Sequence, residues 1–204
     1  EDIVKKGFTN SPKGRKSSRI SKHFVCTSCH NIEREDPHLA IVDPQARLEY
    51  THSLGLPFLQ GSALYGIVNR ESFYNDDYEK KYGLLVEAAR NDLRQAIQLC
   101  ATECSSGRLM KDWELESVLA YLWTLELKMN DLVLTKDEEK MITDALENGA
   151  SKQEAIDKIE SKYMKRSPAH FIDPPGSRSE RNAVKGNADN GELIYSNSCM
   201  HCHG

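Results

Sequence analysis

The chain of 204 residues lacks an apolar run of about 20 residues, the length that a helix needs to cross a bilayer. It also lacks strand-like alternation and any internal repeat beyond one short motif, so we expect a mostly α fold. A formal net charge of -4 gives no reason to expect a nucleic-acid partner. Neither a signal peptide nor an initiator methionine is present, which favours a processed chain that begins at Glu1.

Cysteine, by contrast, is well represented, and its spacing carries the strongest functional signal. The six cysteines form three pairs: Cys26 and Cys29, Cys100 and Cys104, and Cys199 and Cys202. Both outer pairs have the spacing C-x-x-C and are followed at once by a histidine, His30 in "CTSCH" and His203 in "CMHCH". The pattern C-x-x-C-H is typical of covalent attachment of a c-type haem.

The chemistry of haem attachment explains this spacing. Two thiols add to the two vinyl groups of one porphyrin, and the adjacent histidine becomes the proximal ligand of the iron. We therefore predict two haem c groups, held through thioethers by the four outer cysteines Cys26, Cys29, Cys199 and Cys202. The proximal ligands would be His30 and His203.

Two other uses of paired cysteines fit the sequence less well. In a four-cysteine zinc site the two C-x-x-C pairs usually lie within about 15–20 residues of each other, whereas Cys29 and Cys199 are far apart. A thioredoxin-like motif would have a strand before it and a helix after it. Because haem attachment to c-type cytochromes takes place outside the cytoplasm, we expect a periplasmic or extracellular protein.

Composition divides the chain into five segments. Residues 1–24 form a basic, extended arm, and residues 25–130 form a cytochrome c-like helical domain for the first haem. A helical hairpin over 131–165 and a linker over 166–190 follow, and residues 191–204 attach the second haem.

Apolar spacing predicts helices over 78–104 and 112–129 of the first-haem domain, separated from the first motif by a loop over 51–77. On the second helix we expect one face to pack in the core: Leu115, Val118, Leu119, Leu122 and Leu125. In the hairpin, capping boxes are predicted from Thr135 to Glu138 and from Ser151 to Glu154.

The stretch "RNDLRQAIQLCATECSSGRLMKDWELESVLAYLWTL" resembles the first haem domain of dihaem cytochromes related to thiosulfate dehydrogenase. The likeness covers residues 25–127. It comprises the C-x-x-C-H motif, a later Arg/Leu-x-x-x-x-Cys segment, a glycine-containing loop and a helix with the pattern Ala120-Tyr121-Leu122. The resemblance implies that Cys100 is the distal ligand of the first haem, opposite His30. The stretch "GELIYSNSCMHCHG" resembles the opening of a class I cytochrome c domain.

Cys104, one helical turn beyond Cys100, leaves the distal ligation open. In an oxidising compartment the two cysteines can form a disulfide, although positions i and i+4 of a helix lie near the upper end of tolerated Cα separations. The first haem would then take its sixth ligand from His52, His23 or Met110. A thiolate ligand lowers the potential of a haem, whereas methionine raises it.

The second motif closes the printed sequence, and no residues follow it that would cover a haem. Exposed apolar macrocycle is costly, at about 25 cal/mol per Å². We expect cover and a distal ligand from His170 of the same chain, or from His23, His38 or His52 of a neighbouring chain. Head-to-tail contacts between identical subunits form rings or filaments, so an electron-conducting filament is one expectation. A soluble carrier, or a chain that continues beyond Gly204, is the alternative.

Two functions remain open at this point. The protein is either an electron carrier or conduit, or an enzyme that couples thiosulfate oxidatively at the first haem, with Arg94 and Arg108 steering the anion. No Ser, His or Asp stands in the strand–turn–helix context of a hydrolase nucleophile. We favour electron transfer with redox partner proteins or identical subunits, and we predict no catalytic residue.

Overall fold

The computed structural model describes residues 1–149, 151–171, 176–181 and 185–203, without the side chains of residues 201 and 202. Helix makes up 52% of the chain and the described residues contain no strand, which confirms the expectation of a mostly α fold. An isolated antiparallel bridge joins Asn10 and Lys16. None of the helices in this described part combines the length and the apolar character needed to cross a bilayer.

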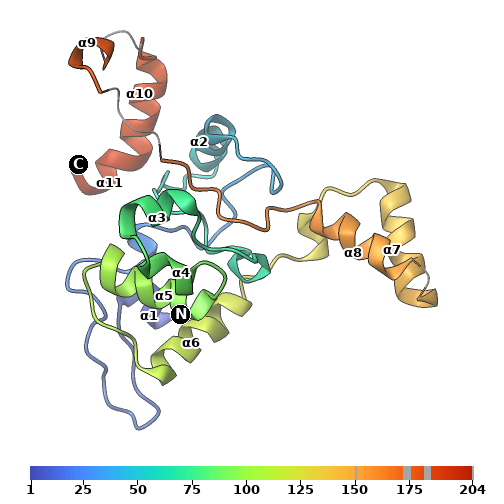
Figure 1. Ribbon diagram of the computed structural model, residues 1–204, viewed down its shortest axis with the longest axis horizontal. Helices are drawn as coiled ribbons and strands as arrows, with labels where there is room; N and C mark the ends of the chain where they lie inside the picture. Colours follow the sequence, from blue (N-terminus) through green and yellow to red (C-terminus); the bar gives the residue numbers. More distant parts are fainter. Residues whose placement is uncertain (150, 172–175, 182–184, 204) are drawn as a thin grey trace.

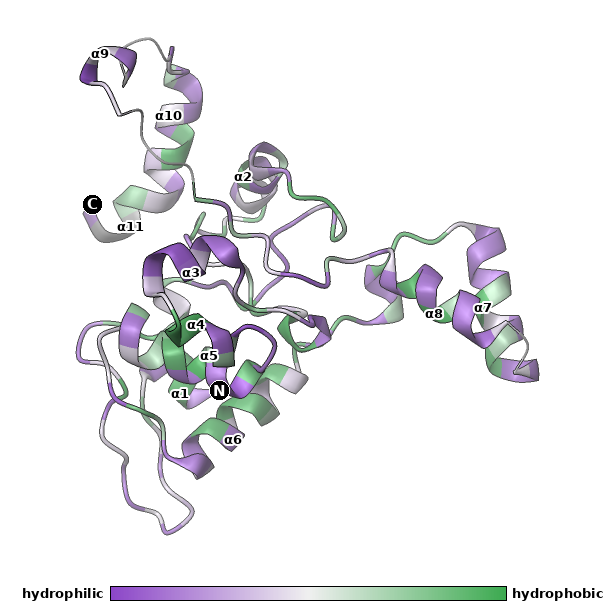
Figure 2. Ribbon diagram, in the orientation of Figure 1, coloured by the Kyte–Doolittle hydropathy of each residue, from purple (hydrophilic) through white to green (hydrophobic). Residues whose placement is uncertain are grey.

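The main apolar core lies between helices α1 (Asp2–Lys6) and α6 (Asp112–Trp123) (Figure 1). Four residues of the predicted apolar face are buried on α6: Leu115, Val118, Leu119 and Leu122. The helix expected over 112–129 ends earlier, at Trp123, so Leu125 lies beyond it and is only partly buried against the same core. Figure 2 shows the largely hydrophobic character of α6. Ile3 and Val4 of α1 pack in the same core. The expected extended arm therefore begins with an anchored helix, because this apolar pair buries itself, and α1 ends at Gly7 with a φ of 76°.

The single helix expected over 78–104 is wrong. The chain instead forms α3 (Asp76–Tyr82), α4 (Leu85–Ala89), α5 (Leu93–Leu99) and the π-helical turn η3 (Cys100–Cys104). Gly83, with a φ of 60°, ends α3 and so causes the first break in the expected helix. The side chain of Asp92 caps the start of α5. Leu84 is consequently exposed, while Val86 is buried beside Tyr74 in a second apolar cluster.

Between the first motif and α3 the chain is mostly loop, interrupted by α2 (Pro44–Ser53) and the 3-10 turn η2 (Ile67–Asn69). The carboxylate of Asp43 accepts hydrogen bonds from the first turn of α2, and Pro44 occupies a position whose N–H would have no partner in the helix. Leu48 and Thr51 face the interior. α2 is thereby fixed against the loop that supports the first motif.

After the 3-10 turn η4 (Met129–Asp131), helices α7 (Lys136–Asn148) and α8 (Lys152–Glu160) form the expected hairpin, which projects from the main body in Figure 1. The capping box of Thr135 and Glu138 is confirmed. The second box is wrong, because Ser151 has a φ of 52° and its side chain makes no capping hydrogen bond. The hairpin has its own small core: Ile142, Ala145 and Ala155.

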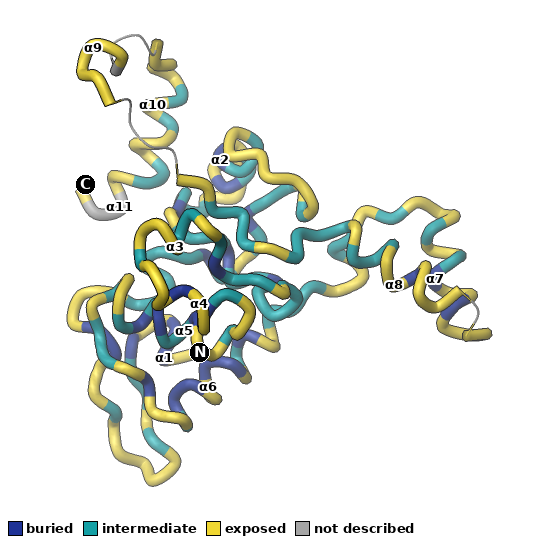
Figure 3. Tube along the Cα trace, viewed as in Figure 1, coloured by how far each residue is buried: buried dark blue, intermediate teal, exposed yellow. Residues whose placement is uncertain are grey.

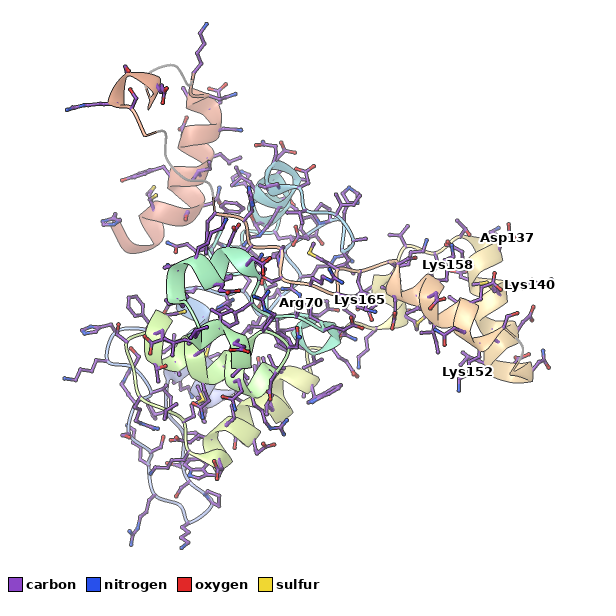
Figure 4. All side chains as sticks on the ribbon, in the orientation of Figure 1. Arg70, Asp137, Lys140, Lys152, Lys158 and Lys165 are labelled. Carbon is purple, nitrogen blue, oxygen red and sulfur yellow. The ribbon has the colours of Figure 1, made fainter. Side chains whose placement is uncertain are left out.

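The Nζ of Lys165 joins the hairpin to the main body, lying 2.7 Å from a carboxylate oxygen of Glu160 and 2.6 Å from one of Glu71 (Figure 4). Beyond it, the expected linker is partly anchored: Phe171 packs edge-on against Tyr78 of α3, with ring centroids 4.9 Å apart. The short helix α9 (Arg178–Arg181) follows.

The last described residues form a helical arm made of α10 (Ala188–Ile194), the π-helical turn η5 (Tyr195–Cys199) and α11 (Met200–His203). Figure 3 shows that this arm and the hairpin are largely exposed, whereas buried residues concentrate in the main body. The arm contacts the main body through α2.

Candidate haem-attachment sites

The first C-x-x-C-H motif folds as one tight turn. The 3-10 turn η1 (Cys26–Ser28) is closed by the N–H groups of Cys29 and His30, which donate to the carbonyl oxygen of Cys26 at 3.1 and 3.0 Å. Cys26 packs against the α1–α6 core, and burial raises the pKa of its thiol to about 11. The turn thus places both cysteines and the histidine on one short piece of backbone.

The ring of His30 is held in one tautomer. Its Nδ1 lies 2.7 Å from the carbonyl oxygen of Ser62. Because a carbonyl oxygen only accepts hydrogen bonds, Nδ1 carries the hydrogen and Nε2 carries the lone pair. Burial lowers the pKa of His30, so the ring is neutral at pH 7. A neutral imidazole oriented through its other nitrogen is the usual form of a metal-ligating histidine.

Two further features around His30 fit a haem. A Cβ at Gly61 would lie 2.4 Å from Cε1 and Nδ1 of His30, so only glycine leaves the ring its place. The Nε of Arg47 is buried without a hydrogen-bond partner among the described residues, which is costly unless an acceptor is supplied. A haem brings two carboxylates. Cys26 and Cys29 would hold that haem, and His30 would bind its iron.

Cys100 and Cys104 share the π-helical turn η3, and both are free thiols in the structure. The hydrogen bond with Cys104 and burial raise the pKa of the half-buried Cys100, and the charged forms of Cys26 and Cys29 lie near enough to act in the same direction. The position of Cys100 near the first motif is compatible with a distal ligand. A disulfide between Cys100 and Cys104 stays a prediction.

Cys104 is the more acidic thiol of this pair. The hydrogen bond from Cys100, helped by those from Tyr82 and Tyr74, lowers the pKa of Cys104 to about 6. The hydroxyl oxygen of Tyr82 lies 3.6 Å from the Cys104 sulfur. Sequence analysis did not predict a role for these tyrosines. They precede η3 by many residues, and they come close to it only because the chain turns after Tyr82 and again before α5.

The second motif lies on the helical arm. Cys199 ends η5, and His203 ends α11; both are exposed, and the side chains of residues 201 and 202 fall outside the description. Polar contacts hold the arm on α2 and on the loop that follows it: Asn190 donates to Oε1 of Gln45 on α2 at 2.7 Å, and the N–H of Phe58 in the loop donates to the carbonyl of Asn197 at 2.9 Å. The attachment residues of the second motif therefore follow directly on a docked helix.

Two of the predicted distal ligands have clear positions relative to this arm. His52 of α2 lies beside the second motif, with its Nδ1 3.2 Å from the amide of Asn197, two residues before Cys199. His170, expected to serve the second haem, instead lies with Nδ1 3.2 Å from a carboxylate oxygen of Asp77 on α3. In the structure, His52 thus contacts the arm that carries the second motif, whereas His170 contacts α3.

The remaining candidates differ in exposure. Met110 is buried in the core against which Cys26 also packs. His23 is exposed and lies edge-on to Phe24, with ring centroids 6.4 Å apart. His38 is exposed near the base of the hairpin, where it lines a shallow pocket with Lys162. Among these three, only Met110 shares the apolar surroundings of the first motif.

The two arginines expected to steer an anion are already paired. Arg108 makes two hydrogen bonds of 2.7 Å to Glu114, a carboxylate with 0% side-chain exposure. Arg94 makes two hydrogen bonds of 3.0 Å to Glu116 on the surface. Both guanidinium groups are neutralised in this way, so neither offers a free positive charge to thiosulfate.

Comparison of the chain with protein-family models, with curated proteins and with solved structures found no match. Among the described residues, no three His, Cys, Asp or Glu side chains converge as ligands for a bare metal ion. The assignment of the two motifs consequently depends on their sequence pattern and on the geometry around His30.

Proposed function

We propose that this chain is a dihaem c-type cytochrome that transfers electrons to and from redox partner proteins outside the cytoplasm. The observation that carries the proposal is the turn of Cys26, Cys29 and His30, whose imidazole presents an Nε2 lone pair because Ser62 fixes Nδ1. A bound haem would supply an iron that alternates between the ferrous and ferric states.

The surrounding residues serve such a function in simple ways. The α1–α6 core, which includes Cys26, excludes water from one side of the first motif and fixes its turn. α2 contacts both sites: Arg47 donates to the carbonyl of Leu59 at 2.7 Å, near His30, and Gln45 contacts Asn190 of the second site. One short helix thus ties the two attachment sites together, which supports electron exchange between them.

Oxidation of thiosulfate is the second candidate, and the position of Cys100 near the first motif favours it. Two thiosulfate ions would join through one S–S bond and release two electrons, one to each haem. The pairing of Arg94 with Glu116 and of Arg108 with Glu114 weighs against it, because neither of the arginines expected to steer the dianionic substrate has a free charge. Electron transfer therefore remains the better-supported function.

The test is a count of covalently bound haem in exported, purified protein. The alkaline pyridine spectrum and the intact mass should give two haems per chain, and one haem in either the Cys26→Ala/Cys29→Ala or the Cys199→Ala/Cys202→Ala variant. Two haems with no thiosulfate-dependent reduction of ferricyanide would support the carrier. Absence of haem from the wild-type chain would refute both functions.

A further inference from the structure

Two arginines converge on the short backbone segment that supports His30. Nη2 of Arg47, from α2, donates to the carbonyl oxygens of Leu59 at 2.7 Å and Gly61 at 3.2 Å. Nη1 of Arg70, which follows η2, donates to Oγ of Ser62 at 2.9 Å. Ser62 also accepts the hydrogen bond from His30 through its carbonyl. Both guanidinium groups therefore lie beside the proposed proximal ligand.

The negative charge available to these two cations is limited. The carboxylate of Glu35, 1% exposed, lies 3.1 Å from Arg47 and also accepts the N–H of Ala63 and the amide of Asn31. Arg70 makes no ion pair within 4 Å in the part of the chain that the structure describes. Glu35 and, to a smaller extent, Asp36 act on Arg70 only at longer range. Burial raises the pKa of Asp36, which disfavours its charged form, and the Glu35 carboxylate is already paired with Arg47.

The donor groups of both arginines are likewise incompletely used. The Nε of Arg47 is buried and has no acceptor among the described residues. The single side-chain hydrogen bond described for Arg70 goes to a neutral hydroxyl. Burial lowers the pKa of Arg70, which reflects the cost of keeping this charge away from water. Figure 4 places Arg70 in the middle of the main body, away from the solvent-exposed hairpin lysines Lys140 and Lys152.

A half-buried guanidinium that lacks a carboxylate partner is costly, and an anion with two oxygens that accept in one plane reduces that cost. We propose that Arg47 and Arg70 bind the propionate groups of the haem attached at the first motif. This inference rests on the proposed function, because it requires a haem at Cys26 and Cys29. Arg70, without an ion pair of its own, supplies the unbalanced positive charge, and Arg47 supplies the buried Nε–H.

A positive charge close to a haem stabilises its reduced state, and a paired propionate stays ionised over a wide pH range. Removal of Arg70 should therefore shift the first haem toward the oxidised state and let a propionate titrate between about pH 5 and pH 8.

The effect is best measured in the Cys199→Ala/Cys202→Ala background, where the first motif carries the only haem. The variants are Arg70→Gln, Arg70→Lys and Arg47→Gln, with the surface residue change Arg94→Gln as the matched control.

We expect full haem content in every variant, because the thioethers hold the group covalently. Arg70→Gln should lower the ratio of reduced to oxidised haem at a given potential about tenfold. For one electron this equals a fall of about 59 mV in the midpoint potential. It should also make the potential fall with rising pH, and Arg70→Lys should restore most of both properties. Arg47→Gln should change the carboxylate bands in the infrared difference spectrum between the reduced and the oxidised protein. Arg94→Gln should change neither the potential, nor its pH dependence, nor these bands.

Three outcomes overturn the inference. Full haem content with the wild-type potential and pH profile in Arg70→Gln would show that Arg70 does not hold a propionate. Suppose instead that added phosphate or thiosulfate shifts the potential of the wild-type protein but not that of Arg70→Gln. Arg70 would then bind an anion from solution and not a propionate. Absence of covalent haem from the wild-type chain would instead refute the proposed function, and this inference with it.

Discussion

Nδ1 of His30 lies 2.7 Å from the carbonyl oxygen of Ser62, and Gly61 stands directly against the same imidazole. The backbone of residues 61 and 62 therefore sets both the tautomer and the position of the proposed proximal ligand. Neither contact uses a side chain of the supporting segment. The orientation of His30 consequently depends on the path of the backbone, and it should be sensitive to any added atom at position 61.

Gly61→Ala should displace the His30 ring. The new Cβ would lie 2.4 Å from Cε1 and Nδ1 of His30 and 2.7 Å from the carbonyl oxygen of Cys29, so ring or backbone must shift. We expect a loss of about 1–3 kcal/mol in the free energy of unfolding, as in other overpacked sites, together with an altered Soret band. Gly186→Ala is the control, because nothing lies within 4 Å of its added Cβ. Identical stabilities and spectra for the two variants would contradict this account.

Cys104 should be alkylated more readily than Cys100, the other thiol in η3. It is exposed, and the hydrogen bond from Cys100 lowers its pKa to about 6, so its reaction with iodoacetamide should reach half its maximal rate near pH 6. Cys100→Ala should move that midpoint to higher pH, and Tyr82→Phe should move it less. Peptide mass spectrometry identifies the labelled residue at each pH.

The same pair separates the two hypotheses for the distal side of the first haem. If Cys104 labels only after a reductant is added, the two cysteines form a disulfide, and the alkylation profile above is wrong. If Cys100→Ser changes the oxidised Soret band and the electron paramagnetic resonance signal, the Cys100 thiolate binds the iron. An unchanged spectrum in Cys100→Ser would rule out thiolate ligation.

Arg108→Ala should destabilise the fold far more than Arg94→Ala. Removal of Arg108 leaves the carboxylate of Glu114, with 0% side-chain exposure, buried without its cation, at a cost of about 3 kcal/mol. The pair of Arg94 and Glu116 is 55% and 57% exposed, so its loss should cost about 1 kcal/mol or less. Urea unfolding followed by circular dichroism measures both. Equal losses in the two variants would show that Glu114 gains little from Arg108.

The sequence predicted those features that depend on neighbouring residues. The periodic leucines of α6, the hairpin with its Thr135 cap and the spacing of the C-x-x-C-H motifs are local patterns, and the first two are confirmed in the structure. The helix over 78–104 was wrong because side-chain periodicity continued through Gly83, where the backbone itself turns. Periodicity measures which side chains are apolar and carries no information on φ.

The support of the first site was not predictable for a different reason. Ser62 contributes a backbone carbonyl, which any residue possesses, and Arg47 and Arg70 become site residues only when α2 and η2 fold toward residues 59–62. His52 and Asn197 are likewise 145 positions apart in sequence. Contacts of this kind depend on tertiary packing, whereas the attachment motif itself is written in five consecutive residues.

The hairpin offers a test of pH dependence away from both motifs. The hydrogen bond from Lys162 to Glu138, followed by that to the backbone of Thr135, lowers the pKa of Glu138 from 4.5 to about 2 in the folded state. Between these values the unfolded chain binds more protons than the folded one, so this contribution to stability is present above about pH 4.5 and is lost as the pH falls toward 2. Glu138→Gln should therefore unfold at a lower temperature than the wild type at pH 7, and the difference should shrink steadily below pH 4.5.

The matched control is Glu139→Gln, a change at an exposed neighbour in the same first turn, since no ion pair within 4 Å is described for Glu139. Thermal unfolding at pH 7, 4 and 2 decides the matter: a Glu138→Gln deficit that stays constant down to pH 2 would mean that the side chain stabilises the hairpin through its shape and not through its charge.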